Sequence, residues 1–283
     1  MIEIASVGGY NEVGKNMTAV KIDDEVVILD VGLYLPAVVG FEDDQNFMSS
    51  DEMIKIGAVP DDNKIKDWWP KIKAVIISHC HLDHSGSAPY LCDKYKAPIY
   101  GTPFTMEILK RILRDKDLKI NNKLVSVKFS EKFQISKNIE CELINVTHST
   151  LQTAIVVLFT KYGIIAYAND FKLDETPTIG KVTNYESLKK LKDVKVLIID
   201  SLYSGLKEKT PSEKKAREML KEILFDKSHK GKAIFITTFS SHLARLKSIA
   251  EFGKEINRKV VFFGRSLNKY VDAGESLKLI KYD

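Results

Sequence analysis

Short apolar runs rich in Val and Ile dominate the first two thirds of the chain, and Gly, Pro, Asp or Asn residues separate them. Runs of this kind are typical of β-strands, and a short polar or Gly break between two of them indicates a hairpin. Two helices are expected among the strands, at Ser87–Tyr95 and from Thr102-Pro103 to Arg114, where Thr precedes Pro at the helix start. This pattern predicts two packed sheets covered by helices. The predicted strands are Ile2–Val7, Met17–Ile22, Glu25–Asp30, Lys73–Ser78, Leu124–Phe129, Ile139–Ile144, Thr153–Thr160 and Ile164–Ala168.

From Val194 onward the pattern changes to a strict alternation of apolar runs and amphipathic segments. Alternation of strand and helix implies a parallel sheet with right-handed crossovers. We therefore predict an α/β protein, with a two-sheet domain over residues 1–195 and the first part of a parallel-sheet domain over residues 196–283. The predicted elements are strands at Val194–Asp200, Lys232–Thr238 and Lys259–Gly264, and helices at Pro211–Phe225, at Ser241–Glu255 and from Leu267.

The composition excludes several classes of protein. A chain of 283 residues with 44% hydrophobic and 29% charged residues is too apolar to be disordered, and no apolar run approaches the roughly 20 residues that span a bilayer. The N-terminus lacks the basic and apolar regions of a signal peptide, and the three cysteines form no CxxC pair. We therefore expect a cytoplasmic protein that binds no membrane.

The net charge of +5 hides an uneven distribution. Residues 1–180 hold 20 Lys and Arg against 25 Asp and Glu, whereas residues 181–283 hold 23 against 13. Such a division is expected where one part of a protein binds cations and the other attracts a polyanion such as nucleic acid. A lysine-rich solvated surface is the alternative interpretation.

Four candidate metal ligands lie together in Ser78-His79-Cys80-His81-Leu82-Asp83-His84, at the end of a predicted strand. Side chains alternate in a strand, so His79, His81 and Asp83 begin on one face, and a turn brings His84 round. Imidazole and carboxylate are ligands that zinc prefers, and four of them exceed what one ion with an open water position needs. The cluster therefore predicts a pair of metal ions, with solvent-facing histidines as the alternative.

Two more candidates follow later strands. His148 comes after Ile144-Asn145-Val146-Thr147, and Asp170 comes after Ala166-Tyr167-Ala168-Asn169. With the cluster, they would complete two coordination spheres, and Asp170 is suited to bridge both ions. His229 is expected at the surface, and the role of His242 stays open.

These residues resemble a known family. The HxHxDH signature at His79–His84, with a later His148 and Asp170, resembles the metallo-β-lactamase superfamily. The whole chain is similar to the archaeal-type RNase J group, which are β-CASP ribonucleases. The resemblance implies a metallo-β-lactamase αββα sandwich followed by a partial parallel-sheet β-CASP-type domain. The segments that carry the RNase J likeness are Gly8–Met17, Asp200–Tyr203, Pro211–Glu213, Thr237–Ser240 and Phe263–Ser266.

The resemblance also implies roles for individual residues. His79, His81 and His148 would hold one zinc ion, Asp83 and His84 the other, and Asp170 would bridge them. Asp83, His84 and Asp170 would thus be the catalytic residues, Asp30 would orient the site, and Asp200 would match the acidic residue that opens the β-CASP region. The candidates for binding a phosphate are Arg265 with Ser266 and the helix start at Ser240 and Ser241. A plain helix cap is the alternative for the two serines.

The function implied is zinc-dependent hydrolysis of RNA, with 5′-monophosphorylated RNA as the substrate, exonuclease activity, and endonuclease activity in addition. A non-catalytic RNA-binding or regulatory subunit is one alternative. A hydrolase of small esters is another, which the basic second half disfavours.

The chain departs from the RNase J pattern at its end. In the family, the chain continues past the Gly-Arg-Ser segment, completes the inserted sheet and supplies a last histidine ligand, whereas no histidine here follows His242. We therefore expect a fragment of a longer protein, a site completed by a partner chain or a homodimer, or a reduced relative.

Overall fold

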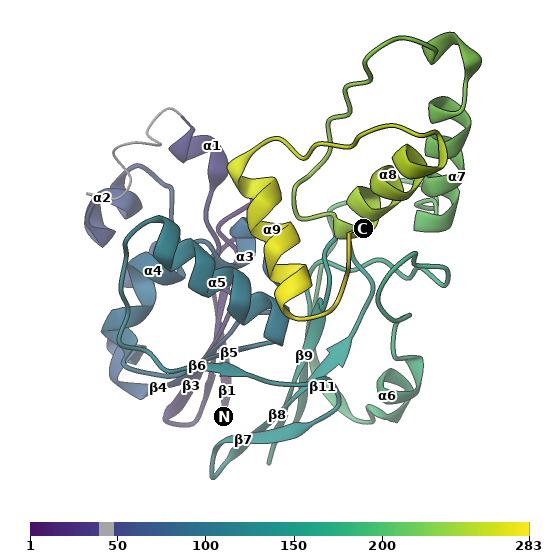
Figure 1. The fold of residues 1–283 in the computed structure, drawn as a ribbon. Coiled ribbons are helices and arrows are strands. Elements are labelled where there is room, and N and C mark those ends of the chain that lie inside the picture. Colours follow the sequence, from purple (N-terminus) through teal and green to yellow (C-terminus); the bar gives the residue numbers. More distant parts are fainter. Residues whose placement is uncertain (40–47, 283) are drawn as a thin grey trace.

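The computed structural model describes residues 1–39 and 48–282. Two mixed β-sheets lie face to face in it (Figure 1). The first sheet has the order β1-β2-β3-β4-β5-β6 and the second has the order β11-β10-β9-β8-β7. The strands of the first sheet are β1 (Ile2–Gly8), β2 (Met17–Ile22), β3 (Glu25–Leu29), β4 (Ile72–Ile76), β5 (Ile99–Gly101) and β6 (Leu124–Ser126). Those of the second are β7 (Lys132–Ser136), β8 (Ile139–Asn145), β9 (Ala154–Thr160), β10 (Gly163–Ala168) and β11 (Val194–Ile199).

Strand direction places the ends of several strands at one edge. In the first sheet β1 to β3 are antiparallel, while β3, β4, β5 and β6 run parallel to one another. In the second sheet β8 and β10 both run antiparallel to β9, so they share a direction. The loops that follow β3 and β4, and those that follow β8 and β10, therefore begin at common sheet edges.

Half of the helices in the described residues pack on the outer face of the first sheet, among them α4 (Ala88–Leu91) and α5 (Pro103–Asp115) (Figure 1). The predicted helix at Ser87–Tyr95 is present, but its second half is a 3-10 helix, and the helix from Pro103 is confirmed. The helices in the first two thirds are α1 (Leu35–Val38), α2 (Ser50–Lys55), η2 (Asp62–Lys71), α3 (Leu82–Ser85), α4 (Ala88–Leu91), η3 (Cys92–Tyr95), α5 (Pro103–Asp115) and α6 (Tyr185–Lys190). Those that follow are α7 (Glu213–Leu224), η4 (Lys227–His229), α8 (Leu243–Glu255) and α9 (Arg265–Ser276).

The central strands bury side chains on both faces, which explains why they read as continuous apolar runs. In β3, Val27 and Leu29 pack in the space between the two sheets, and Val26 and Ile28 pack under the helices. The outer face of the second sheet is covered by Leu188 of α6 and by Leu191. The predicted sandwich of two sheets between helical layers is confirmed.

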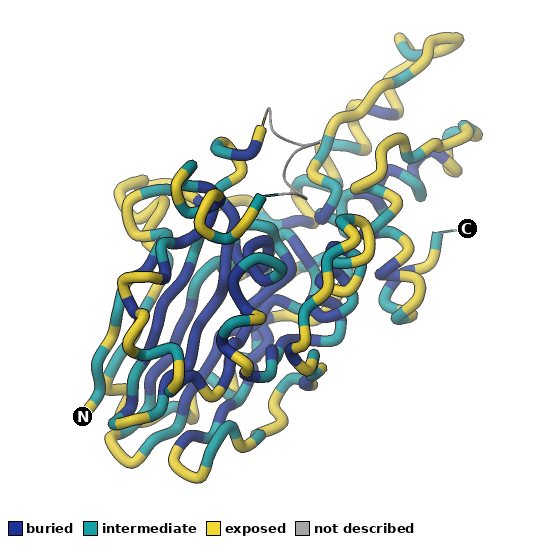
Figure 2. The backbone as a smooth tube through the Cα atoms, turned by 90° about the vertical axis from the view of Figure 1, so that its left-hand side faces the viewer, coloured by how far each residue is buried: buried dark blue, intermediate teal, exposed yellow. Residues whose placement is uncertain are grey.

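The predicted parallel sheet after residue 196 is wrong in two of its three strands. Val194–Ile199 does form a strand, β11, but it extends the second sheet by pairing in parallel with β10. Lys232–Thr238 and Lys259–Gly264 form no strand. Phe235 and Phe263 in these segments are 94% and 93% exposed, and the same part of the chain is largely exposed in Figure 2. An apolar run acquires strand structure only when a neighbouring strand satisfies its backbone, and no described strand lies beside these runs. The predicted domain boundary between residues 195 and 196 falls inside β11, and its position stays a prediction.

The three α-helices of this region, α7, α8 and α9, are nevertheless attached to the sandwich. Tyr270 of α9 packs near Phe104 of α5, with ring centroids 6.4 Å apart. Leu243 and Leu246 of α8 belong to the same buried cluster, which also contains Cys80. Helix α7 packs against α8, where Arg217 pairs with Glu251 at 2.6 Å.

A buried carboxylate joins α7 to α8. Glu213, the first residue of α7, accepts hydrogen bonds from Nε and an Nη atom of Arg245 at 2.9 and 3.1 Å. Its backbone N–H donates to Asp174 at 2.6 Å, which ties the start of α7 to the loop after β10. Burial raises the pKa of Glu213, but its hydrogen bonds with His242 and Arg245 outweigh that effect and lower the pKa to about 2.

Replacing Glu213 should therefore change the pH dependence of stability. A carboxylate with a depressed folded-state pKa contributes stability above its unfolded pKa, and the contribution is lost as the pH falls through the folded value. We expect the difference in unfolding free energy between the wild type and E213Q to shrink by at most about 3 kcal/mol as the pH falls from 5 toward 2. Denaturant titration at a series of pH values measures it, with E218Q as the control at an exposed position of α7. A difference that stays constant over this range would contradict the assignment.

Candidate metal centre

The histidine cluster lies where β4 ends and α3 begins. His81 immediately precedes α3, and its carbonyl oxygen accepts hydrogen bonds from the N–H groups of His84 and Ser85 at 3.0 and 2.9 Å. This turn brings His84 back toward His79, so that their ring centroids lie 4.0 Å apart. The loops after β8 and β10 carry His148 and Asp170 to the same edge.

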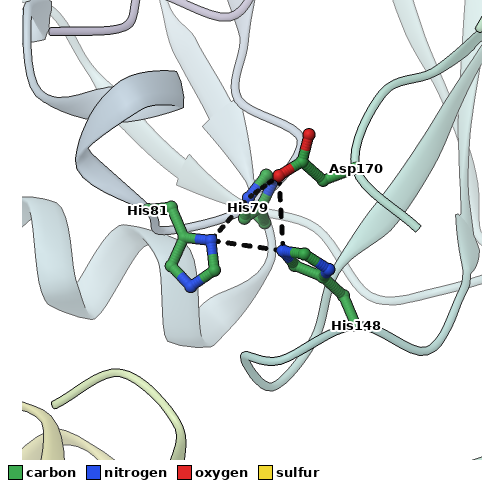
Figure 3. Close-up of side chains that lie close together, drawn as sticks. All are labelled: His79, His81, His148 and Asp170. Carbon is green, nitrogen blue, oxygen red and sulfur yellow. Dashed lines mark hydrogen bonds and ion pairs between the residues drawn. The ribbon is translucent and has the colours of Figure 1, made fainter. Parts of the chain in front are cut away.

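Four of the predicted residues form a first donor set, made of His79, His81, His148 and Asp170, whose ligand atoms all lie within 4.8 Å of one another (Figure 3). The Nδ1 atom of His81 is 3.0 Å from Nε2 of His79 and 3.3 Å from Nε2 of His148. The Oδ2 atom of Asp170 is 3.4 Å from Nε2 of His148 and 3.9 Å from Nε2 of His79.

A second donor set contains Asp83, His84 and Asp170. The Nε2 atom of His84 is 3.5 Å from Oδ2 of Asp83 and 3.5 Å from Oδ1 of Asp170. Asp170 thus turns one carboxylate oxygen toward each set. The geometry allows this residue to bridge two ions.

Asp30 lies behind both sets and is completely buried. Its carboxylate accepts hydrogen bonds from the Ser78 N–H at 2.7 Å, the Ser78 hydroxyl at 2.8 Å and the Tyr167 hydroxyl at 2.9 Å. The Nδ1 atom of His84 lies 2.8 Å from the same carboxylate. Ser78 in turn has its hydroxyl oxygen 3.0 Å from Nδ1 of His79. These contacts aim the Nε2 atoms of His79 and His84 at the donor sets.

The protonation states suit metal binding at the first set. Burial lowers the pKa of His79 well below its usual value, and it lowers those of His81 and His148 to about 3 and about 4. These imidazoles are therefore neutral at pH 7, and each has a lone pair available.

In the second set, neighbouring charges and burial shift the pKa values in opposite directions. Burial would lower the pKa of His84, but the Asp30 carboxylate and hydrogen bonds to Asp170 and Asp30 outweigh it and hold that pKa well above its usual value. Burial raises the pKa of Asp170, yet its hydrogen bond and charge interaction with His84 lower it to about 2. The carboxylates are thus ionised donors.

The side chains present fit a pair of divalent transition-metal ions. The first set offers three neutral imidazoles and a carboxylate, which matches the preference of zinc for nitrogen and oxygen ligands. The second set offers one imidazole and two carboxylates, one of them shared. Each of His79 and His84 has its other ring nitrogen held by an oxygen, as is usual for metal ligands.

A cavity of about 1180 Å³ opens beside the donor sets. His148 and Asp170 line it, together with Asp200, whose carboxylate accepts a hydrogen bond from the N–H of Leu202 at 2.8 Å. Four lysines also line the cavity, Lys128, Lys172, Lys181 and Lys209. Six acidic residues line it as well, Glu131, Asp170, Asp174, Asp200, Glu208 and Glu213, so the lining is of mixed charge.

The candidate phosphate-binding residues are not brought together. The Ser241 hydroxyl lies 3.0 Å from Nε2 of His81, and Ser240 beside it is half-buried. Arg265 and Ser266 are exposed at the start of α9, and the described residues that line the cavity do not include them. Their binding of a phosphate stays a prediction.

The remaining histidines divide as follows. His229 is partly exposed in η4, where its Nε2 lies 2.9 Å from the carbonyl oxygen of Ile223. His242 lines the cavity, and its Nε2 lies 3.4 Å from the carboxylate of Glu213.

Sequence analysis did not identify several residues that contact the centre, among them Ser78, Tyr167 and Asn16. Ser78 and Tyr167 contact Asp30, and Asn16 donates a hydrogen bond to the carbonyl oxygen of Asp83 at 2.9 Å and lies 3.2 Å from Nε2 of His84. Asn16 belongs to the Gly8–Met17 segment that carries the RNase J likeness, which was the available signal.

Comparison with known proteins agrees with this architecture. Residues 10–171 match the sequence profile of the metallo-beta-lactamase superfamily, and residues 231–283 match that of the ribonuclease J beta-CASP domain. The chain is 40% identical to ribonuclease J from Methanocaldococcus jannaschii over 99% of its own length and 64% of that protein's length. It is also 40% identical to ribonuclease J from Pyrococcus abyssi, over 99% of its own length and 63% of that of the relative. The chain thus spans a little under two thirds of these curated relatives.

A solved structure shares the fold. A protein of unknown function from Enterococcus faecalis V583 superposes with a TM-score of 0.66, at 18% identity, over 96% of this chain and 67% of the other. Within residues 1–39 and 48–282, no helix has both the length and the apolar character needed to cross a membrane.

Removing the Asp30 carboxylate should destabilise the protein even without metal. D30A would leave the donors of Ser78, His84 and Tyr167 buried without their acceptor. We expect the unfolding free energy of the metal-free protein to fall by about 3–5 kcal/mol. Denaturant titration in the presence of a chelator measures this, with D67A at an exposed position as a control expected within about 0.5 kcal/mol of the wild type. A loss for D30A no larger than that of D67A would contradict the central role of Asp30.

Proposed function

Because this chain belongs to the metallo-β-lactamase superfamily and is RNase J-like, we propose that it is a zinc-dependent ribonuclease that hydrolyses RNA phosphodiester bonds. Its substrate is 5′-monophosphorylated RNA, which it degrades as an exonuclease, with endonuclease cleavage as a second mode. The observation that carries the proposal is the position of Asp170, which presents one carboxylate oxygen to each of two adjoining donor sets.

The donor sets would hold the catalytic ions. His79, His81 and His148 would bind one ion, Asp83 and His84 would bind the other, and Asp170 would be shared between them. Bound zinc lowers the pKa of water toward 7 and neutralises the charge that develops on the phosphoryl oxygens. Asp30 keeps His84 and, through Ser78, His79 in the orientation that binding needs.

Asp83 orients the attacking water. Burial raises the pKa of Asp83, but the hydrogen bond and charge interaction with His84 outweigh it and lower that pKa. Asp83 is therefore ionised at pH 7 and accepts a hydrogen bond from the water, or its proton, at the edge of the second donor set.

The surroundings of the site favour a polyanion over a small neutral ester. Residues 181–283 carry ten more basic than acidic side chains, counted as 23 against 13, and four lysines line the cavity among its acidic residues. Lys128, Lys172, Lys181 and Lys209 contact the RNA backbone as it approaches Asp170. Asp200 lies on the wall of the same cavity, and we assign to it the role of the acidic residue at the start of the β-CASP region.

We place the enzyme in the cytoplasm, where RNA is present and thiols stay reduced. Cys80, Cys92 and Cys141 are buried and free, which suits such a compartment.

Cleavage of a 5′-monophosphorylated RNA, with and without a chelator, tests the proposed function. The wild type should cleave, and the chelator should stop cleavage. D170N should lower the rate by at least about 10²-fold, because one substitution weakens both donor sets. H229A, which alters a partly exposed histidine outside the cavity lining, should cleave like the wild type.

Two outcomes would overturn this proposal. Full activity of D170N would show that the donor sets are not the catalytic centre. Tight RNA binding without cleavage, with a single ion per chain, would identify a non-catalytic RNA-binding protein instead.

A further inference from the structure

Three histidines of the metal centre have their outward ring nitrogen held by an oxygen atom. The Nδ1 atom of His79 is 3.0 Å from the Ser78 hydroxyl, and Nδ1 of His84 is 2.8 Å from the Asp30 carboxylate. Both partners belong to the ends of β3 and β4. The third histidine, His81, has its Nε2 atom 3.0 Å from the hydroxyl of Ser241, which is 160 residues further along the chain.

We propose that Ser241 is a positioning residue that fixes His81 for metal binding, so that the region around α8 contributes to the metal affinity of the first donor set. The inference rests on the proposed metal-dependent function and adds to it a residue from the part of the chain that matches the β-CASP domain.

The hydrogen-bonding capacity of imidazole supports this assignment. A neutral imidazole has one N–H and one lone pair. The Nδ1 atom of His81 faces the Nε2 atoms of His79 and His148, so its lone pair must point into the donor set if the three are to bind one ion. The proton of His81 is then on Nε2, and this N–H donates a hydrogen bond to the Ser241 hydroxyl oxygen. A proton on Nδ1 would instead point at the other donors and block the site.

The Ser241 hydroxyl is available for this contact because it does not cap α8. The residue that precedes α8 is His242, and no side chain there accepts a hydrogen bond from the first turn. Ser241 is buried, and its carbonyl oxygen accepts the N–H of Leu243 at 3.0 Å. The plain-cap interpretation of this serine therefore does not apply.

Packing holds Ser241 at its position independently of the hydrogen bond. Leu243, two residues later, is completely buried in a cluster with Cys80, which lies between His79 and His81 in the sequence. Arg245 in the first turn of α8 is paired with Glu213, whose N–H is bound by Asp174. The start of α8 is thus anchored against the histidine segment on one side and against α7 on the other.

Metal affinity of serine variants of the full chain tests the inference. We would measure Zn²⁺ binding by competition with a chromophoric chelator and record the visible spectrum of the Co²⁺-loaded protein. S241A should weaken the binding of one ion by about 10–100-fold and alter the Co²⁺ spectrum, whereas S241T, which keeps a hydroxyl, should restore most of the affinity.

The matched control is S248A. Ser248 is also a buried serine, in α8 where this helix contacts α7. Its hydroxyl accepts a hydrogen bond from Arg217 at 3.0 Å and donates one to the Ala244 carbonyl oxygen at 3.1 Å. Its replacement removes a buried hydroxyl without touching the metal centre, so it should leave the affinity for both ions unchanged.

Each outcome bears on the inference. Equal affinity in S241A and the wild type would overturn it, and so would an S241T variant as weak as S241A, because packing alone would then explain the loss. A wild type that binds no ion would instead sink the proposed function. Should S241A not fold, nitrogen-15 NMR of the metal-free wild type decides, since a His81 proton on Nε2 supports the inference and a proton on Nδ1 overturns it.

Discussion

The metal centre depends on a buried charge, the carboxylate of Asp30, which belongs to neither donor set. Asp30 follows β3, and because β3 and β4 are parallel, its carboxylate reaches the end of β4, where it binds Ser78 and the imidazole of His84. A buried carboxylate is costly unless its hydrogen-bonding capacity is filled. The carboxylate of Asp30 accepts hydrogen bonds from Ser78, which contacts His79, and it contacts His84 directly. The contacts that offset the cost of burying this charge therefore also orient two histidines of the donor sets.

The second sheet supplies the other half of the centre. Strands β8 and β10 share a direction, so His148 and Asp170 leave the sheet at one edge, and the packing of the two sheets brings that edge to the histidine segment. Asp170 can then contact both donor sets, which neither sheet could build alone. The catalytic proposal follows from the position of Asp170 between the two donor sets.

Much of the centre could be predicted because its chemistry is local. The spacing of His79, His81, Asp83 and His84 is compact, and apolar runs mark the strand ends before His148 and Asp170. The contact between Ser241 and His81 could not be predicted, because no pattern links two residues that tertiary packing alone brings together. The strand predictions at Lys232–Thr238 and Lys259–Gly264 failed for a related reason, since an apolar run reports a tendency to form a strand and says nothing about a neighbour to pair with.

The most direct test of the central claim is anomalous diffraction at the zinc edge from crystals of the full chain grown with zinc. The account predicts two anomalous peaks, about 3.5–4 Å apart, on the two sides of the Asp170 carboxylate. A single peak, or peaks that do not contact Asp170, would contradict a binuclear centre built on this residue.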